Sequence, residues 1–177
     1  MYMWNNPVEP VIYSADAIDR DLKRILNLTY FNSPLFYTFF EIMYELGVRA
    51  GEAINIQLWK RTINNTVTLQ PQKNNEKRIF DASIINSTFI DYIDNPDTFP
   101  SYVNYSRLNS EFRKYTMFHK IYVGDKSSSL HLFRHNFVKK LQEQGYTDIE
   151  IKEVMGERNL SSVASYTNSV YSNLPTL

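Results

Sequence analysis

The sequence of 177 residues contains no cysteine, which excludes disulfide bonds and thiolate metal ligands and suits a reducing compartment. Its three histidines do not show, with neighbouring carboxylates, the spacing of a zinc site. No apolar run approaches ~18 residues, the length that a membrane-spanning helix needs. The N-terminus lacks the basic segment and apolar stretch of a secretory signal. We therefore predict no metal, no cofactor, no membrane segment and a cytoplasmic location.

An excess of charge of one sign is also lacking, because 19 Lys and Arg residues balance 19 Asp and Glu residues. The distribution is uneven, however: residues 101–140 hold eight basic and two acidic residues, and a second basic cluster lies within residues 60–78. A basic face on a neutral protein fits the phosphate backbone of double-stranded DNA, although such clusters are also common as solvated surfaces. The residues that we predict to contact DNA are Lys60, Arg61, Arg107, Arg113, Lys114, Lys139 and Lys140.

The chain does contain many apolar and aromatic residues, with 43% hydrophobic residues, 13 Tyr and 11 Phe, as expected of a folded globule. Apolar side chains at helical spacing, beginning with Ile18 and Leu22, predict a first helix. Pro34 and the aromatic-rich run up to Gly47 predict a second helix that contributes to the core. Further helices are predicted at about residues 84–92, 107–117 and 131–144.

The period of the pattern changes around residues 62–83. Alternating β-branched residues in TINNTVTLQPQ and KRIFDAS flank KNNEK, which predicts a small hairpin or a three-stranded sheet. Thr147 and Glu150 have the spacing of a capping box, which begins a last helix that Gly156 ends. No repeat or linker divides the chain. The predicted fold is a single domain over residues 1–177, mainly α with a small antiparallel β-sheet, in the α+β class.

Five residues have the chemistry to cut a phosphodiester without a metal. The charge that develops on the non-bridging oxygens calls for permanently charged, bidentate donors, which are arginines. The reaction also needs a nucleophile that forms a covalent intermediate and a proton donor for the leaving oxygen. The sequence offers, in this order, Arg49, Lys73, His131, Arg134 and Tyr166. Simpler interpretations are that Arg49 compensates a helix dipole and that His131 and Arg134 form a surface pair.

The order and spacing of these residues resemble the catalytic domain of tyrosine recombinases, the family of phage integrases and Xer-like enzymes. YELGVRAGEAINI resembles the first family box, with Arg49 and Glu52 on its Arg-x-x-Glu positions. HLFRHNF resembles the second box, His-x-x-Arg-His, and EVMGERNLSSVASYTN resembles the segment that carries the nucleophile, here Tyr166. The resemblance implies the recombinase catalytic-domain fold. It also implies that DNA is cut and rejoined through a covalent 3′-phosphotyrosyl intermediate without metal.

The resemblance also implies roles for several neighbours of these boxes. Lys73 lies where the family keeps its catalytic lysine, with Lys77 as the alternative in the same segment. Tyr171 is the alternative to the proposed nucleophile. Glu52 is expected to support Arg49, and His135 to pack beneath the second arginine rather than contact DNA.

The chain departs from the family pattern at Glu157, where a second catalytic histidine or another hydrogen-bond donor is usual. An ionised carboxylate accepts hydrogen bonds, cannot donate them, and repels a phosphate. We expect Glu157 to face the pocket or its rim, next to the nucleophile's segment. Two ways around the repulsion are that Arg158 supplies the missing donor or that Glu157 turns outward.

Relatives of this kind usually carry an N-terminal core-binding domain, and nothing in this sequence corresponds to it. We therefore expect the chain to be a fragment of a longer protein, one that assembles into a tetramer on DNA and associates with the nucleoid. Three alternatives stay open. The two short helices around Gly145 have the helix–turn–helix arrangement of a DNA-binding regulator. A type IB topoisomerase shares much of this chemistry. The third alternative is a recombinase fold that binds DNA while its catalysis is impaired.

Overall fold

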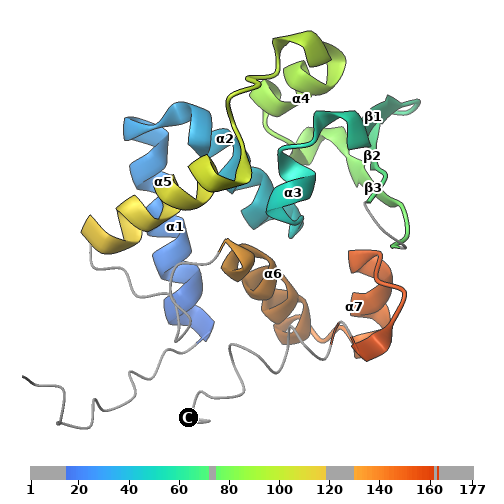
Figure 1. Ribbon diagram of the computed structural model, residues 1–177. Coiled ribbons are helices and arrows are strands. Elements are labelled where there is room, and N and C mark those ends of the chain that lie inside the picture. Colours follow the sequence, from blue (N-terminus) through green and yellow to red (C-terminus); the bar gives the residue numbers. More distant parts are fainter. Residues whose placement is uncertain (1–14, 72–74, 119–129, 162, 164–177) are drawn as a thin grey trace, which may run out of the picture.

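The computed structural model describes residues 15–71, 75–118, 130–161 and 163 of the chain. Seven α-helices and one sheet of three strands lie in this part (Figure 1), which confirms the predicted fold class. The helices are α1 (Ala15–Asn32), α2 (Pro34–Leu46), α3 (Ala50–Ala53), α4 (Ser87–Asp94), α5 (Tyr105–Phe118), α6 (His131–Glu143) and α7 (Asp148–Met155). Single 3₁₀ turns occur at Ile56–Leu58, Ala82–Ile84 and Pro96–Thr98. None of the described helices is both long and apolar enough to cross a membrane.

Helix α2 is the centre of the structure. Pro34 begins it, as predicted, since a proline at the first position costs no hydrogen bond, and Gly47 ends it in the left-handed conformation at φ 65°. A side chain at position 47 would also meet Phe137, because an added Cβ would lie 2.5 Å from its ring. Phe39 and Phe40 are fully buried, whereas α1 covers α2 with its predicted apolar stripe.

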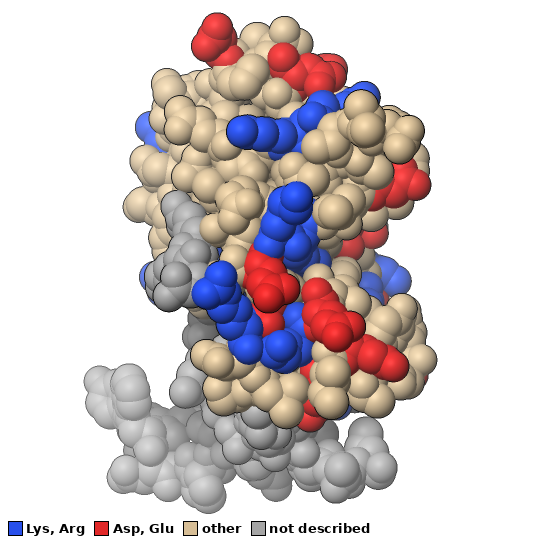
Figure 2. Space-filling view, turned by 90° about the vertical axis from the view of Figure 1, so that its right-hand side faces the viewer, with Lys and Arg blue, Asp and Glu red and all other residues tan. Residues whose placement is uncertain are grey.

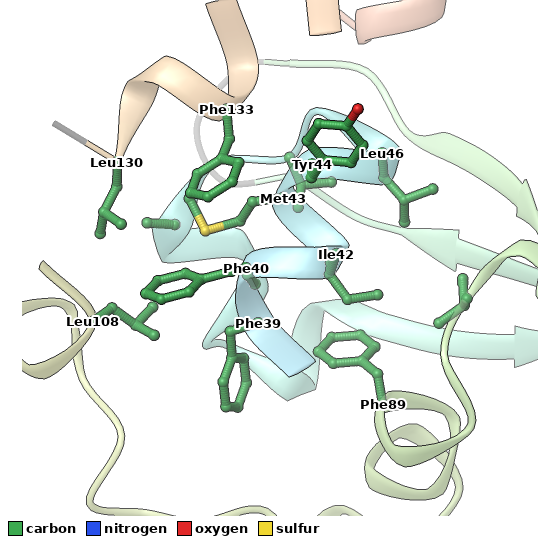
Figure 3. Packing of buried hydrophobic residues seen from close by; sticks show 14 of the residues in the cluster. Phe39, Phe40, Ile42, Met43, Tyr44, Leu46, Phe89, Leu108, Leu130 and Phe133 are labelled. Atoms are coloured by element: carbon green, nitrogen blue, oxygen red, sulfur yellow. The ribbon is translucent and has the colours of Figure 1, made fainter. Parts of the chain in front are cut away.

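Aromatic packing fixes α6 against α2 (Figure 3). The rings of Phe40 and Phe133 are stacked with 5.7 Å between their centroids, and Phe112 of α5 lies edge-on to Phe133 at 5.5 Å. Such pairs contribute roughly 0.5–1.5 kcal/mol each beyond the burial of their surface. Because Phe133 directly precedes Arg134, this packing also fixes the point on α6 from which the Arg134 side chain projects.

The sheet is antiparallel, with strand order β1 (Trp59–Thr62), β2 (Thr66–Leu69) and β3 (Arg78–Asp81). The tight turn joins β1 and β2, with Asn64 and Asn65 at positive φ, a conformation that asparagine tolerates better than most residues. The first strand begins at Trp59, whereas the sequence pattern placed the start of the sheet at about residue 62. One face of the sheet is buried, and α4 packs against β1. In Figure 1 the sheet lies beside α7, at the right of the molecule.

Helix α7 begins and ends as the sequence predicts. The Thr147 side chain accepts from the backbone of Glu150, and the Glu150 side chain accepts from the backbone of Thr147, which together form the capping box. Gly156 ends the helix at φ 67°. A small apolar cluster holds α7 to α6, formed by Val138, Leu141, Ile151, Met155 and Val163.

Candidate functional site

The C-terminus of α2 holds two buried arginines from distant parts of the chain. Arg78 Nη2 donates to the carbonyl of Leu46, and Arg134 Nη1 donates to the carbonyl of Gly47, both at 2.7 Å. The last carbonyls of a helix lack partners within the helix and carry the negative end of its dipole, so they favour cations. Arg78 is 5% exposed and Arg134 1% exposed. The end of α2 therefore anchors both guanidinium groups.

Arg49 lies immediately after α2, at the N-terminus of α3. Its backbone N–H donates to Oε1 of Glu52 at 2.8 Å, and its Nη1 lies 4.0 Å from the same oxygen. Glu52 is itself buried, and its backbone carbonyl accepts from Trp59 Nε1 at 2.8 Å. The spacing of three residues between Arg49 and Glu52 is thus a helix cap that fixes the backbone from which the arginine projects.

Glu157 joins the two arginines of the predicted boxes. Its Oε1 accepts from Arg49 Nη2 and from Arg134 Nη2, each at 2.7 Å. The side chain is 3% exposed, so this is a buried pairing of one carboxylate with two guanidinium groups. Glu157 is buried and does not turn to solvent. Arg158, in contrast, is exposed.

The segment before β3 packs on the end of α7 and supports this pairing. The backbone N–H of Glu76 donates to the carbonyl of Gly156 at 2.8 Å, and Arg78 Nε donates to the carbonyl of Val154 at 3.0 Å. With its amide nitrogen turned toward Glu157, Asn75 donates to Oε2 and accepts from Arg49 Nη1, both at 3.3 Å. An added Cβ at Gly156 would lie 2.6 Å from the carbonyl oxygen of Glu76, so only glycine fits here.

A pocket of about 220 Å³ opens beside the arginine pair. His131, the first residue of α6, lies in its wall together with Arg49 and Glu52. Partial burial lowers the pKa of His131, and the positive charges of Arg49 and Arg134 lower it further. The imidazole is therefore neutral at neutral pH and able to accept a proton. The full lining is Arg49, Ala50, Gly51, Glu52, Asn75, Tyr105 and His131.

The structure thus brings together Arg49, Arg134 and His131 of the five predicted catalytic residues. The other two, Lys73 and Tyr166, lie outside the described residues, as does Tyr171. Lys77 is exposed, and His135 is half-buried on α6 directly after Arg134.

Sequence reasoning missed three residues around this site. Asn75 and Tyr105 line the pocket, and Arg78 stands behind the arginine pair with its guanidinium over the ring of Phe80. Asn75 carried a usable signal, since it lies two residues after Lys73. No signal in the sequence distinguished Tyr105, because a tyrosine at the start of a surface helix is common. Among the described residues, no three His, Asp or Glu side chains are grouped as metal ligands.

The predicted DNA-contacting residues differ in their surroundings. Exposed ones are Lys60, Arg61, Arg107, Arg113 and Lys114, whereas Lys139 and Lys140 are half-buried. The ammonium group of Lys140 lies 2.8 Å from Asp19, in a network between α1, α2 and α6 that occupies it. On the face that carries the sheet and α7, basic and acidic side chains lie next to each other (Figure 2). This face therefore does not present a field of one sign.

Comparison with known proteins shows what this arrangement is similar to. The sequence profile of the phage integrase family matches residues 20–173. The XerH site-specific recombinase, in a post-cleavage complex with palindromic difH substrate, has a TM-score of 0.63 and 15% identity, over 93% of this chain and 51% of that chain. The XerA recombinase has a TM-score of 0.58 and 18% identity, over 94% and 61%.

The integrase of transposon Tn1549, in complex with transposon right end DNA, is also similar, with a TM-score of 0.53 and 14% identity over 94% of this chain and 65% of that chain. The chain spans roughly half to two thirds of the length of these proteins. At these identities the similarity concerns the fold. No match was found among curated proteins.

Proposed function

The chain belongs to the phage integrase family, and from this premise we propose that it is the catalytic domain of a site-specific DNA recombinase. The domain cuts and rejoins double-stranded DNA through a covalent 3′-phosphotyrosyl intermediate and uses no metal. In the full-length protein, four copies assemble on the DNA. The XerH and Tn1549 integrase structures, which contain DNA, support DNA as the partner.

The convergence of Arg49 and Arg134 on one point carries this proposal. Their Nη2 atoms lie 2.7 Å from a single oxygen atom, although 85 residues separate them in the sequence. Two guanidinium groups that share one oxygen match the charge and geometry of a phosphodiester, whose non-bridging oxygens gain negative charge during the reaction. His131 in the adjoining pocket supplies a neutral base at the same place.

The proposed reaction assigns one role to each residue. The phenol oxygen of Tyr166 attacks phosphorus in line while His131 takes the phenol proton, because a phenol with a pKa of roughly 10 is a weak nucleophile at neutral pH. The bond from phosphorus to the 5′-oxygen breaks, and Lys73 protonates that oxygen. Arg49 and Arg134 stabilise the charge on the non-bridging oxygens. Attack by a 5′-hydroxyl on the phosphotyrosine reverses the step and rejoins the strand.

The test is covalent capture of DNA by the full-length protein. A labelled pool of nicked suicide duplexes of random sequence is incubated with wild type, Tyr166→Phe and Tyr171→Phe in the presence of EDTA, and adducts are resolved on a denaturing gel. We expect an adduct with wild type and with Tyr171→Phe, and none with Tyr166→Phe, which changes little volume and keeps DNA binding. An adduct that persists in Tyr166→Phe but is lost in Tyr171→Phe would contradict the assignment, and a requirement for metal would contradict the mechanism.

A second candidate function is DNA binding without cleavage. The pairing of Glu157 with both arginines favours it, because a carboxylate there competes with the scissile phosphate. In that case the wild-type protein binds duplex DNA yet forms no adduct at any sequence in the pool. Binding by wild type together with adduct formation excludes this candidate.

A further inference from the structure

We propose that Glu157 is an internal ligand of the arginine pair, which occupies the place of the substrate phosphate in the free protein and exchanges with it on binding. This inference rests on the proposed function, since it concerns how the same site admits a phosphate. It assigns to Glu157 the control of anion affinity, and it makes the described structure the occupied, closed form of the site.

The first support is that carboxylate and phosphate compete for the same donors. Glu157 Oε1 accepts from Nη2 of Arg49 and of Arg134 at 2.7 Å, the length typical of a charge-assisted hydrogen bond to a phosphate oxygen as well. Arg134 is 1% exposed, so an anion from solvent cannot reach its guanidinium group while Glu157 is in place. Arg49 is 31% exposed and lines the pocket, which leaves a path for an anion from that side.

The second support is the charge of the cluster. Three guanidinium groups lie near one another, those of Arg49, Arg78 and Arg134, with the carboxylates of Glu52 and Glu157 as their neighbours. Removal of Glu157 without replacement leaves two buried positive charges in excess, which is costly in a protein interior. A phosphodiester carries one negative charge, so its exchange for the Glu157 carboxylate leaves the net charge of the cluster unchanged.

The third support is that the backbone around Glu157 is held and that Asn75, which contacts its side chain, lines the pocket. The carbonyl of Gly156 accepts from Glu76 N–H at 2.8 Å, and Arg78 holds the carbonyl of Val154. Asn75 stands 3.3 Å from Oε2 and belongs to the pocket wall. The proposed exchange therefore requires the Glu157 side chain to rotate past Asn75 while the backbone after α7 keeps its place.

The test measures the thermal unfolding of the protein with inorganic phosphate as probe, against sodium chloride at equal ionic strength. The variants are Glu157→Gln and, as matched control, Asp19→Asn, which also removes a carboxylate that holds cations but lies in the separate network of α1 and α6. We expect wild type to show no specific response and both variants to unfold at lower temperature. Phosphate should raise the Tm of Glu157→Gln alone, by roughly 3–6 °C at a tenfold excess over its Kd.

An equal phosphate response in wild type and in Glu157→Gln would overturn the proposal, because it would place the anion elsewhere. So would a Glu157→Gln variant that phosphate does not stabilise. If Glu157→Gln does not fold, Glu157→Asp replaces it: the charge stays, the shorter side chain reaches the two arginines poorly, and a smaller phosphate response is expected, whereas no response contradicts the proposal. The adduct assay with Tyr166→Phe decides the proposed function separately, since an adduct can form whether or not phosphate binds in place of Glu157.

Discussion

Helix α6 contributes to two polar clusters, and the two are built differently. Near its start, Arg134 meets Arg49 on one oxygen of Glu157. Two residues further along, Asn136 faces Asp19 of α1, whose Oδ1 also accepts from Tyr44 at 2.7 Å and from Lys140 at 2.8 Å. Both clusters join distant segments through a carboxylate. Only the first brings two cations onto the same oxygen atom, since Lys23 approaches the other oxygen of Asp19, Oδ2, at 3.3 Å.

The two clusters also differ in how far their cations are exposed to water. The side chain of Lys140 is 33% exposed, so water shares in the solvation of its charge, whereas that of Arg134 is 2% exposed. The Asp19 cluster also uses a neutral amide and a hydroxyl as donors, and it holds three helices in register. In the Glu157 cluster one oxygen takes both Arg49 and Arg134, while Glu52 lies 4.0 Å from Arg49, and our proposal is that a phosphate exchanges with Glu157. The Asp19 cluster thus spreads its partners over three helices and stabilises their packing, whereas the Glu157 cluster has the converging cations on which our proposed phosphate site rests.

The largest effect is expected for Arg134→Met. The substitution keeps the bulk of the side chain but removes the donor to the Gly47 carbonyl and one of the two arginines on Glu157. Because a hydrogen bond from a charged group contributes about 1.5–3 kcal/mol, unfolding in urea should show a loss of about 3–6 kcal/mol. Adduct formation should fall at least ~10²–10³-fold, the typical effect of removing one donor to a developing oxyanion. A stability within about 1 kcal/mol of wild type would show that Arg134 is not the buried anchor described above.

A smaller effect is expected for Asp19→Asn. The amide cannot accept equally well from Lys140, and a lost charge-assisted hydrogen bond costs about 1.5–3 kcal/mol. The adduct yield at a temperature well below the unfolding transition should equal that of wild type. A fall in yield beyond that explained by unfolding would show that the Asp19 cluster also takes part in the reaction.

The pH dependence of stability should separate the clusters further. Burial raises the pKa of Asp19, but hydrogen bonds from Lys140, Asn136 and Tyr44 outweigh it, so the pKa lies well below its usual value. A depressed folded-state pKa contributes stability that is present above the unfolded pKa of roughly 3.9 and is lost as pH falls below it. Urea unfolding of wild type and Asp19→Asn should therefore differ by a constant amount above about pH 5 and converge toward lower pH.

The smallest effect concerns His131. Its pKa is lowered by partial burial and by the two arginines, so it stays neutral to lower pH than an ordinary histidine. As the pH is lowered, the rate of adduct formation should fall, with its midpoint below the usual histidine pKa of roughly 6.5. His131→Gln should lose this inflection. A wild-type midpoint above 6.5 would show that another group serves as the base.

Local rules predicted most of the fold. The ends of α2 and α7 depend on Pro34, Gly47, Gly156 and a capping box, which act within a few residues. The start of β1 was missed because Trp59 pairs with Leu69 across a turn whose asparagines adopt positive φ, a property of the fold more than of the strand.

The site was predictable only in part. The boxes indicated Arg49 and Arg134, but not that Glu157 would lie between them, because the direction of a side chain after Gly156 depends on the contact between Glu76 and α7. Arg78 escaped attention for the same reason. In the sequence it is one of several basic residues, and only burial distinguishes it.

The separation of these partners along the chain has a consequence for synthesis. Arg49 and Glu157 are 108 residues apart, and Arg134 and Gly47 are 87 residues apart. Closing loops of this length costs more conformational entropy than closing short ones, and the contact cannot form before both partners have been synthesised. During translation Arg49, which follows α2, emerges long before Glu157, so the pairing with this carboxylate can form only after the residues that follow α7 have left the ribosome. The pairing of Glu157 with the two arginines therefore requires that the chain from Arg49 to Glu157 has been synthesised.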